Sequence, residues 1–319
     1  MGALTAIKEK SVSVLTEERI IADVIQAMSD ACPPFPEGPG GDCAHLPETG
    51  GRAFRVSTVD GVILGRHFDL ACEGRRAGAK LVNRNLSDLA AAGARPSDAL
   101  LALTLGPDVD AGWLRDFAFG AGRAAVKAGL RIVGGDVAQG PAGVFVATLS
   151  VQGQAHRVLS RRGTAEGDVL FVTGSLGGSA YGRHLDFTPR LAEGEWLCGR
   201  GEVTACTDVS DGLIKDLPGM LGRGLDAKVD LTRIPVAESA SLLSKGDGKP
   251  ALEHALMDGE DHELAFSARA AAADALETDF RKAFPGTALT RIGTAAKGEG
   301  RLTDLKGEAV AGRGFSHFA

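Results

Sequence analysis

The ten residues Cys206-Thr207-Asp208-Val209-Ser210-Asp211-Gly212-Leu213-Ile214-Lys215 decide how this chain is interpreted. Two carboxylates, Asp208 and Asp211, stand three residues apart with a hydroxyl between them, and a glycine closes the segment before an apolar stretch. Carboxylate oxygens are the ligands that hard divalent cations prefer. The segment therefore predicts a site that holds a cation.

Four more carboxylates stand at positions that we interpret as loops or ends of elements: Asp42, Asp60, Asp88 and Asp136. If they converge, a positive charge must join them, because two like charges about 4 Å apart repel by about 4 kcal/mol at an effective dielectric constant near 20. Mg²⁺ bound through a few carboxylates and the oxygens of a polyphosphate meets this need. The pattern predicts a magnesium and polyphosphate site.

Composition limits the class of protein. The chain has 319 residues, 44% of them hydrophobic, and a formal net charge of −6, with no run rich in Lys and Arg that would neutralise a nucleic acid. We find neither a signal peptide nor an apolar run of 18 residues, and the five cysteines form no CxxC pair. We therefore expect a cytoplasmic protein that binds neither nucleic acid nor membrane.

The first half alternates helices and strands. A capped apolar stripe predicts a helix over 16–28. A strand over 53–59 delivers Asp60 at its far end, and a second strand over 130–133 stops at Gly134-Gly135-Asp136. The remaining elements expected here are helices over 78–92 and 113–128 and strands over 99–105 and 143–152.

The second half repeats this alternation. We expect strands over 169–173, 228–231, 263–267 and 288–292, and helices over 211–221, 236–243 and 270–284. Such alternation predicts an α/β (α+β) protein of two domains, each a mixed sheet covered by helices. We place the division at residue 152, giving an N-terminal domain over 1–152 and a C-terminal α/β domain over 153–319.

Inspection excludes a Walker-type phosphate loop, and nucleophilic catalysis and zinc hydrolysis lack support in the sequence. The chain contains no GxxxxGK[ST] phosphate loop, no HExxH helix and no Ser/His/Asp triad at a recognisable spacing. What remains is an inventory of carboxylates and glycines that suits charge neutralisation and positioning. Phosphoryl transfer requires little else, so it is the reaction class that we favour.

Two other segments are candidates for a substrate pocket. The acidic run Asp258-Gly259-Glu260-Asp261-His262 directly precedes an apolar strand, so Glu260 is expected near the end of a sheet. His67 follows Asp60 by seven residues and has Arg66 beside it, a pair suited to an anionic ligand.

Taken in order, the motifs resemble those of the thiamine-monophosphate kinase family, within the aminoimidazole ribonucleotide synthetase-like superfamily. The resemblance spans nearly the whole chain. It rests on Gly41-Asp42, Asp60 with His67-Phe68, Asn85-Leu86-Ser87-Asp88, Gly134-Gly135-Asp136, Arg161 with Gly167-Asp168, Asp208-Val209-Ser210-Asp211-Gly212, Gly259-Glu260-Asp261 and Gly314-Phe315.

The resemblance implies an ATP-dependent transferase, a kinase of thiamine diphosphate biosynthesis that phosphorylates thiamine monophosphate by in-line, Mg²⁺-assisted transfer. It implies a homodimer whose N-terminal domains pair through their sheets. Asp208 and Asp211 would be catalytic. The implied ligands of several Mg²⁺ ions are Asp42, Thr58, Val59, Asp60, Asp88, Asp136, Asp208 and Asp211. The implied contacts to ATP are Gly135, Asp136, Arg161 and Ser210, and those to the thiamine compound are His67, Glu260 and Phe315.

The chain departs from the family pattern at three positions. Gly41 replaces the first of two usual aspartates, Val59 replaces a threonine that commonly contributes a ligand, and His262 replaces a tyrosine. The change at Val59 matters least if that ligand is the backbone carbonyl. Two alternatives therefore stay open. One is a related ATP-dependent kinase or synthetase that acts on another small molecule, and the other is a non-catalytic nucleotide-binding paralogue.

Overall fold

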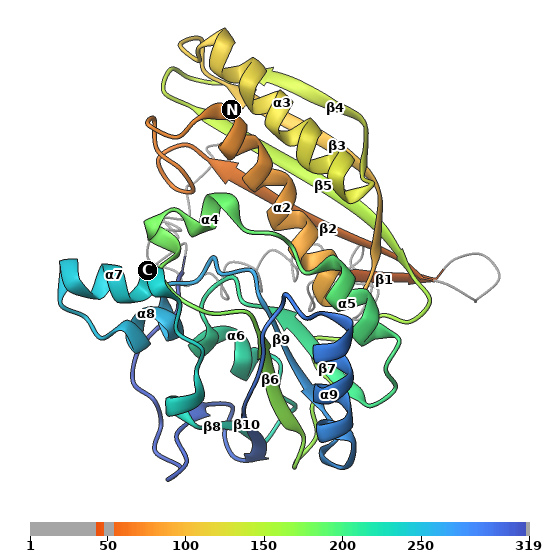
Figure 1. The fold of residues 1–319 in the computed structure, drawn as a ribbon. Coiled ribbons are helices and arrows are strands. Elements are labelled where there is room, and N and C mark those ends of the chain that lie inside the picture. The colour runs from red at the N-terminus through yellow and green to blue at the C-terminus, as the bar shows by residue number, and fades with distance from the viewer. Residues whose placement is uncertain (1–42, 48–53, 317–319) are drawn as a thin grey trace, which may run out of the picture.

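The computed structural model describes residues 43–47 and 54–316. Within them the chain forms two mixed β-sheets, one from each half of the sequence, with helices packed on them (Figure 1). The helix expected over 16–28 and the predicted ligand Asp42 lie outside the described residues.

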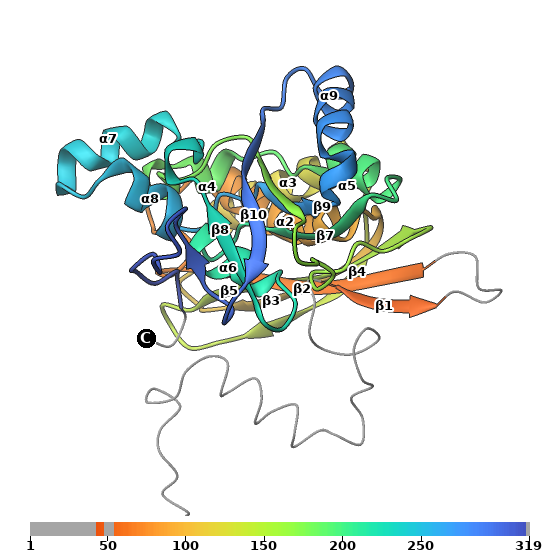
Figure 2. The same ribbon diagram turned by 90° about the horizontal axis from the view of Figure 1, so that it is seen from below.

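The first sheet has the strand order β1-β2-β5-β3-β4, in which only β3 and β4 are parallel. Its strands are β1 (Ala44–Pro47), β2 (Phe54–Ile63), β3 (Arg95–Leu105), β4 (Arg131–Gln139) and β5 (Phe145–Ala155). Helices α2 (Gly74–Ala92) and α3 (Ala111–Ala128) cover one face, because every second residue of β5, such as Leu149, is apolar and packs under them. Among the described residues, no helix packs on the other face of this sheet (Figure 2).

The second sheet has the order β11-β8-β10-β6-β9-β7. Its strands are β6 (Val169–Thr173), β7 (Val203–Asp208), β8 (Leu225–Val229), β9 (Leu264–Ala268), β10 (Leu289–Lys297) and β11 (Leu302–Thr303). Its α-helices are α4 (Arg183–Asp186), α5 (Leu191–Cys198), α6 (Leu213–Gly219), α7 (Glu238–Asp247), α8 (Ala251–Met257) and α9 (Ala273–Ala283). All residues of β6 and β9 are buried, as expected for strands covered on both faces. The predicted class, mixed sheets covered by helices, is confirmed.

Helix α2 lies between the two halves. It contacts α3 and β2 on one side and α5 and β7 on the other. The approach to α3 requires a glycine at position 78, because a Cβ there would lie 2.0 Å from the carbonyl oxygen of Phe117. This position lets the side chains of α2 reach residues of the second sheet.

Several predicted elements need correction. Asp60 lies inside β2 and Asp136 inside β4, so neither follows the end of a strand. Both strands continue because their backbones stay hydrogen-bonded to neighbouring strands whatever the side chain. Asp88 lies within α2, as the helix expected over 78–92 requires, and not at a loop or the end of an element. The helix expected over 270–284 begins as a separate 3₁₀ turn. β7 and α8 were not predicted. The division at residue 152 falls inside β5 and stays a prediction.

Candidate active site

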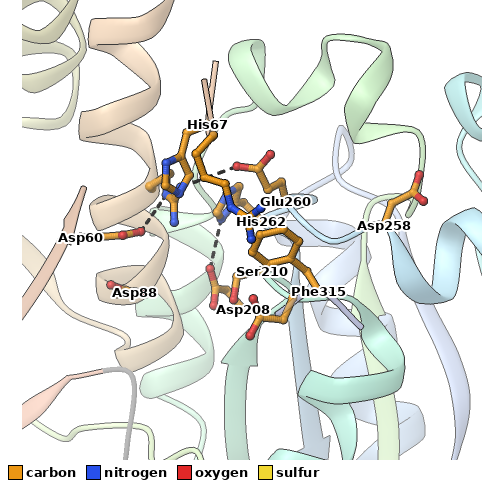
Figure 3. Close-up of a pocket in the computed structure, with 12 residues that line it drawn as sticks. Asp60, His67, Asp88, Asp208, Ser210, Asp258, Glu260, His262 and Phe315 are labelled. Atoms are coloured by element: carbon orange, nitrogen blue, oxygen red, sulfur yellow. Dashed lines mark hydrogen bonds and ion pairs between the residues drawn. The ribbon is translucent and has the colours of Figure 1, made fainter. Parts of the chain in front are cut away.

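A pocket lies between the two halves of the molecule, and acids from both halves line it (Figure 3). Its first-half residues come from β2, the loop after it and α2. Its second-half residues come from the end of β7 and the segment after it, the loop before β9 and the C-terminal segment. The lining residues are Asp60, Arg66, His67, Arg84, Asp88, Asp208, Ser210, Asp211, Asp258, Glu260, His262 and Phe315.

In the first half, two carboxylates are held by neighbours on β2 and α2. Asp88 accepts a hydrogen bond of 2.6 Å from the hydroxyl of Thr58, and Asp60 forms an ion pair of 2.7 Å with the Nε of Arg84. Asn85 accepts from the backbone N–H of Asp60 at 2.9 Å, which fixes β2 against the helix. Thr58, Asp60 and Asp88 therefore lie together, as the sequence predicted.

In the second half, Asp208 ends β7 and is buried. Ser87 of α2 donates its hydroxyl proton to the Oδ2 of Asp208, and the Nδ1 of His262 lies 3.3 Å from the same oxygen. Burial alone would raise the pKa of Asp208, but the hydrogen bond and charge of His262 hold this pKa below its ordinary value. Asp211 forms an ion pair of 2.7 Å with Lys215.

The local field of the pocket is negative. Burial raises the pKa of Asp216 well above its ordinary value, and the charges of Asp211 and Asp208 add to this shift. Asp216 accepts hydrogen bonds from the backbone N–H groups of Ser210 and Asp211, and so fixes the turn that carries them. A site with this field favours cations or a ligand that brings them.

The loop before β9 is strained where it meets the pocket. Glu260 has a φ of 54° and His262 a φ of 51°, a left-handed region that costs of order 1–3 kcal/mol for residues with side chains. Their backbone N–H groups donate to the carbonyl oxygens of Ser210 and Val209, at 2.7 and 2.8 Å. The turn 208–212 therefore imposes this conformation and aims Glu260 at the pocket.

The three residues predicted for the organic substrate also meet here. His67 lies in the loop after β2, and its Nδ1 accepts from the backbone N–H of Ile63 at 3.0 Å. Phe315 donates its backbone N–H to Asp211 at 2.8 Å, and the guanidinium of Arg66 lies 4.7 Å from the centre of its ring. His67, Glu260 and Phe315 all line the pocket.

Some predicted site residues lie elsewhere in the chain. Pairing across the first sheet runs from Asp60 through β5 and β3 to Gly135, which is three strand spacings, or about 14 Å. Asp136 follows Gly135 and so lies on the other face of the sheet, exposed, as does Val59. Arg161 is nearer the pocket and donates its Nε–H to Thr207 at 3.2 Å.

The sequence reasoning missed residues that support the pocket. Arg84 stands four residues before Asp88 on α2, so helical periodicity alone places the two on one face. Lys80 lies on the same face of α2, one turn before Arg84. His184 contacts both Lys80 and Glu260 from α4, a proximity that nothing in the sequence indicates.

The carboxylates of the pocket suit a hard cation, although in this structure their oxygens are bonded to other side chains of the protein. Within residues 43–47 and 54–316, no group of three or more His, Cys, Asp or Glu side chains is arranged to hold a metal ion. Thr58, Ser87, Arg84 and Lys215 occupy the carboxylate oxygens instead. Mg²⁺ commonly takes one or two carboxylates and fills its other positions with water and phosphate oxygens, so the residues present fit it.

Two family models match the chain. They are described as AIR synthase related protein, N-terminal domain, over residues 40–155, and AIR synthase related protein, C-terminal domain, over residues 182–304. A thiamine-monophosphate kinase of Rhodopirellula baltica is 37% identical over 75% of this chain and 76% of that protein. That of Escherichia coli (strain K12) is 34% identical over 88% of this chain and 92% of that protein. The chain belongs to the thiamine-monophosphate kinase family.

Solved structures share the fold of this family member. The thiamine-monophosphate kinase of Stenotrophomonas maltophilia K279a matches with a TM-score of 0.71 and 28% identity, over 92% of this chain and 98% of that chain. A structure described as AaThiL complexed with AMPPCP and TMP matches with a TM-score of 0.83 over 98% of this chain and all of that chain, at 23% identity. No helix in the described part of this kinase-family chain is long and apolar enough to cross a membrane.

Proposed function

We propose that this protein transfers the γ-phosphoryl group of ATP to thiamine monophosphate and forms thiamine diphosphate. The observation that carries this function is the gathering of carboxylates from both sheets in one pocket, in a chain whose relatives are thiamine-monophosphate kinases. AaThiL, a protein of the same fold, is described as complexed with AMPPCP and TMP.

The residues of the pocket divide into two groups. Asp60, Asp88, Asp208 and Asp211 form its acidic side, and we assign them to Mg²⁺, with Asp208 and Asp211 nearest the reacting phosphates. Bound there, Mg²⁺ would neutralise the polyphosphate and hold it in line with the acceptor. His67, Glu260 and Phe315 form the other side, which we assign to the thiamine compound.

The reaction places few demands on proton transfer. The acceptor atom is a phosphate oxygen that is already deprotonated at neutral pH, so no strong general base is required. The protein's task is to position two anionic phosphates against each other. Ser210 presents a hydroxyl at the junction of the two groups, and Arg161 adds positive charge beside Asp208. We assign both to ATP.

We further propose that the protein acts as a homodimer joined through the uncovered face of the first sheet, the face on which no helix of residues 43–47 and 54–316 packs. Apolar side chains stand exposed there: Val59 is 61% exposed, Leu100 54% and Ile63 42%. A sheet face that carries such residues normally packs on a partner, and a second copy offers the same surface for an isologous contact. Asp136 lies on this face, so its predicted role depends on this assembly.

The test is product formation. The purified protein is incubated with ATP, Mg²⁺ and thiamine monophosphate, and thiamine diphosphate and ADP are separated by chromatography. We expect one ADP for each thiamine diphosphate, and no product from Asp211→Asn. ADP formed only with another monophosphate would support the related-kinase alternative. Binding of ATP without turnover of any acceptor would support the non-catalytic paralogue.

A further inference from the structure

A lysine is completely buried beside the acceptor side of the pocket. Lys80 lies on α2, and its side chain has no exposed surface. Taking an ammonium group out of water costs several kcal/mol unless close partners compensate. Burial accordingly lowers the pKa of Lys80, and the charge of Glu260 opposes this shift. Because burying the ammonium group of Lys80 is costly, we expect it to have a role, and its contacts indicate which.

The ammonium group has three N–H donors and three polar neighbours, two of them hydrogen-bonded to it and one in an ion pair. The backbone oxygen of His67 lies 2.7 Å from Nζ, the Oε1 of Glu260 lies 2.7 Å away, and the Nδ1 of His184 lies 2.5 Å away. These acceptors belong to three separate segments: the loop after β2, the strained loop before β9, and α4. Lys80 therefore ties together parts of the chain that are distant in sequence.

The protonation state of His184 is consistent with its accepting a hydrogen bond from Lys80. Burial and the charge of Lys80 lower the pKa of His184 to about 4, so its ring is neutral near pH 7. A neutral ring whose Nδ1 accepts from Lys80 carries its proton on Nε2. Glu260 differs: although burial acts against its charge, Lys80 and Arg84 hold its pKa below the ordinary value. The cluster thus presents one ionised carboxylate to the pocket.

We propose that Lys80 is a positioning residue that fixes Glu260 and the His67 segment next to each other on the acceptor side of the pocket, and so sets the affinity for the phosphoryl acceptor. This inference rests on the proposed function, because it assigns Glu260 to the acceptor. Arg84 has a different task, since its Nη1 lies 3.6 Å from Glu260 while its Nε pairs with Asp60 on the metal side.

The experiment compares KM values for the two substrates. Lys80→Met keeps an unbranched side chain of nearly the same length and removes the charge. We expect KM for thiamine monophosphate to rise at least tenfold while KM for ATP changes less than twofold. Leu276→Ala is the matched control for lost stability, because it opens a cavity in the core under α9, away from the pocket. This control should leave both KM values unchanged.

A double-mutant cycle with Glu260→Gln shows whether Lys80 acts through Glu260. In the Glu260→Gln background, Lys80→Met should raise KM for the acceptor less than threefold further. Should Lys80→Met alone fail to fold, the double variant removes both charges and is expected to fold, and its KM is then compared with that of Glu260→Gln. A further tenfold rise there would overturn the inference, as would an unchanged KM in folded Lys80→Met.

The outcomes separate this inference from the proposed function. If the unaltered protein forms no thiamine diphosphate, the proposed function fails before any variant is compared. If it forms the product and Glu260→Gln weakens acceptor binding while Lys80→Met does not, only the role of Lys80 fails.

Discussion

The buried carboxyl of Asp261 makes the stability of the protein depend on pH. Asp261 lies beside the pocket, its Oδ1 accepts from the backbone N–H of Gly177 at 2.8 Å, and its Oδ2 has no protein partner among the described residues. Burial raises the pKa of this carboxyl to about 8, against 3.8 for an ordinary aspartate. Between these values the folded chain holds one proton more than the unfolded chain.

The sign follows from linkage. A folded state that binds more protons loses stability as the pH rises, by about 1.4 kcal/mol per pH unit for one proton. From pH 5 to pH 7 this amounts to about 3 kcal/mol. Asp261→Asn keeps the acceptor for Gly177 and has no proton to lose. We expect the variant to gain about 3 kcal/mol relative to the unaltered protein over this range.

Urea unfolding at pH 5, 6 and 7, followed by circular dichroism in the presence of a chelator, measures this difference. Asp274→Asn is the control for the change in net charge, because its side chain is 91% exposed. A difference between Asp261→Asn and the unaltered protein that stays constant within 0.5 kcal/mol over the three pH values would refute the reasoning.

Three further predictions concern activity, assembly and packing. Asp211→Asn should reduce ADP release to background while the circular dichroism spectrum stays unchanged; turnover within tenfold of normal would contradict the site assignment. Leu100→Glu, on the uncovered face of the first sheet, should shift the molar mass measured by light scattering from that of a dimer to that of a monomer, and an unchanged dimer would exclude this face. Gly78→Ala should lower the free energy of unfolding by about 1–3 kcal/mol in urea titrations, because its Cβ would meet the carbonyl oxygen of Phe117, and no change would show that α2 and α3 separate freely.

Local patterns in the sequence predicted most of the fold. The buried strand over 169–173 was predicted at its observed bounds, and the predicted bounds of α2 and α3 were within four residues of the observed ones. Apolar periodicity and C-terminal glycines mark such elements in the sequence. β7 was missed because its residues belong to the motif around Asp208, which reads as a loop. The bounds of β2 and β4 were too short because backbone pairing continues past Asp60 and past Gly134-Gly135-Asp136, where the sequence pattern indicated strand ends.

The site was predictable as a list of residues but not as an arrangement. Sequence motifs named Asp60, Asp88, Asp208 and Glu260, and these meet in the pocket. The same reasoning also named Asp136, which lies on the other face of the first sheet. Contacts between segments distant in sequence, such as Lys80 with His184, depend on how α2 packs against the second half. No local pattern encodes them.

The most direct test of the central claim is a crystal structure grown with Mn²⁺ and a non-hydrolysable ATP analogue, in which anomalous scattering locates the metal. We predict metal peaks within about 2.5 Å of oxygens from both halves of the chain, Asp88 in the first and Asp208 or Asp211 in the second, with the phosphates of the analogue bound to the same ions. Metal and nucleotide bound to one half only, or outside this pocket, would contradict the account.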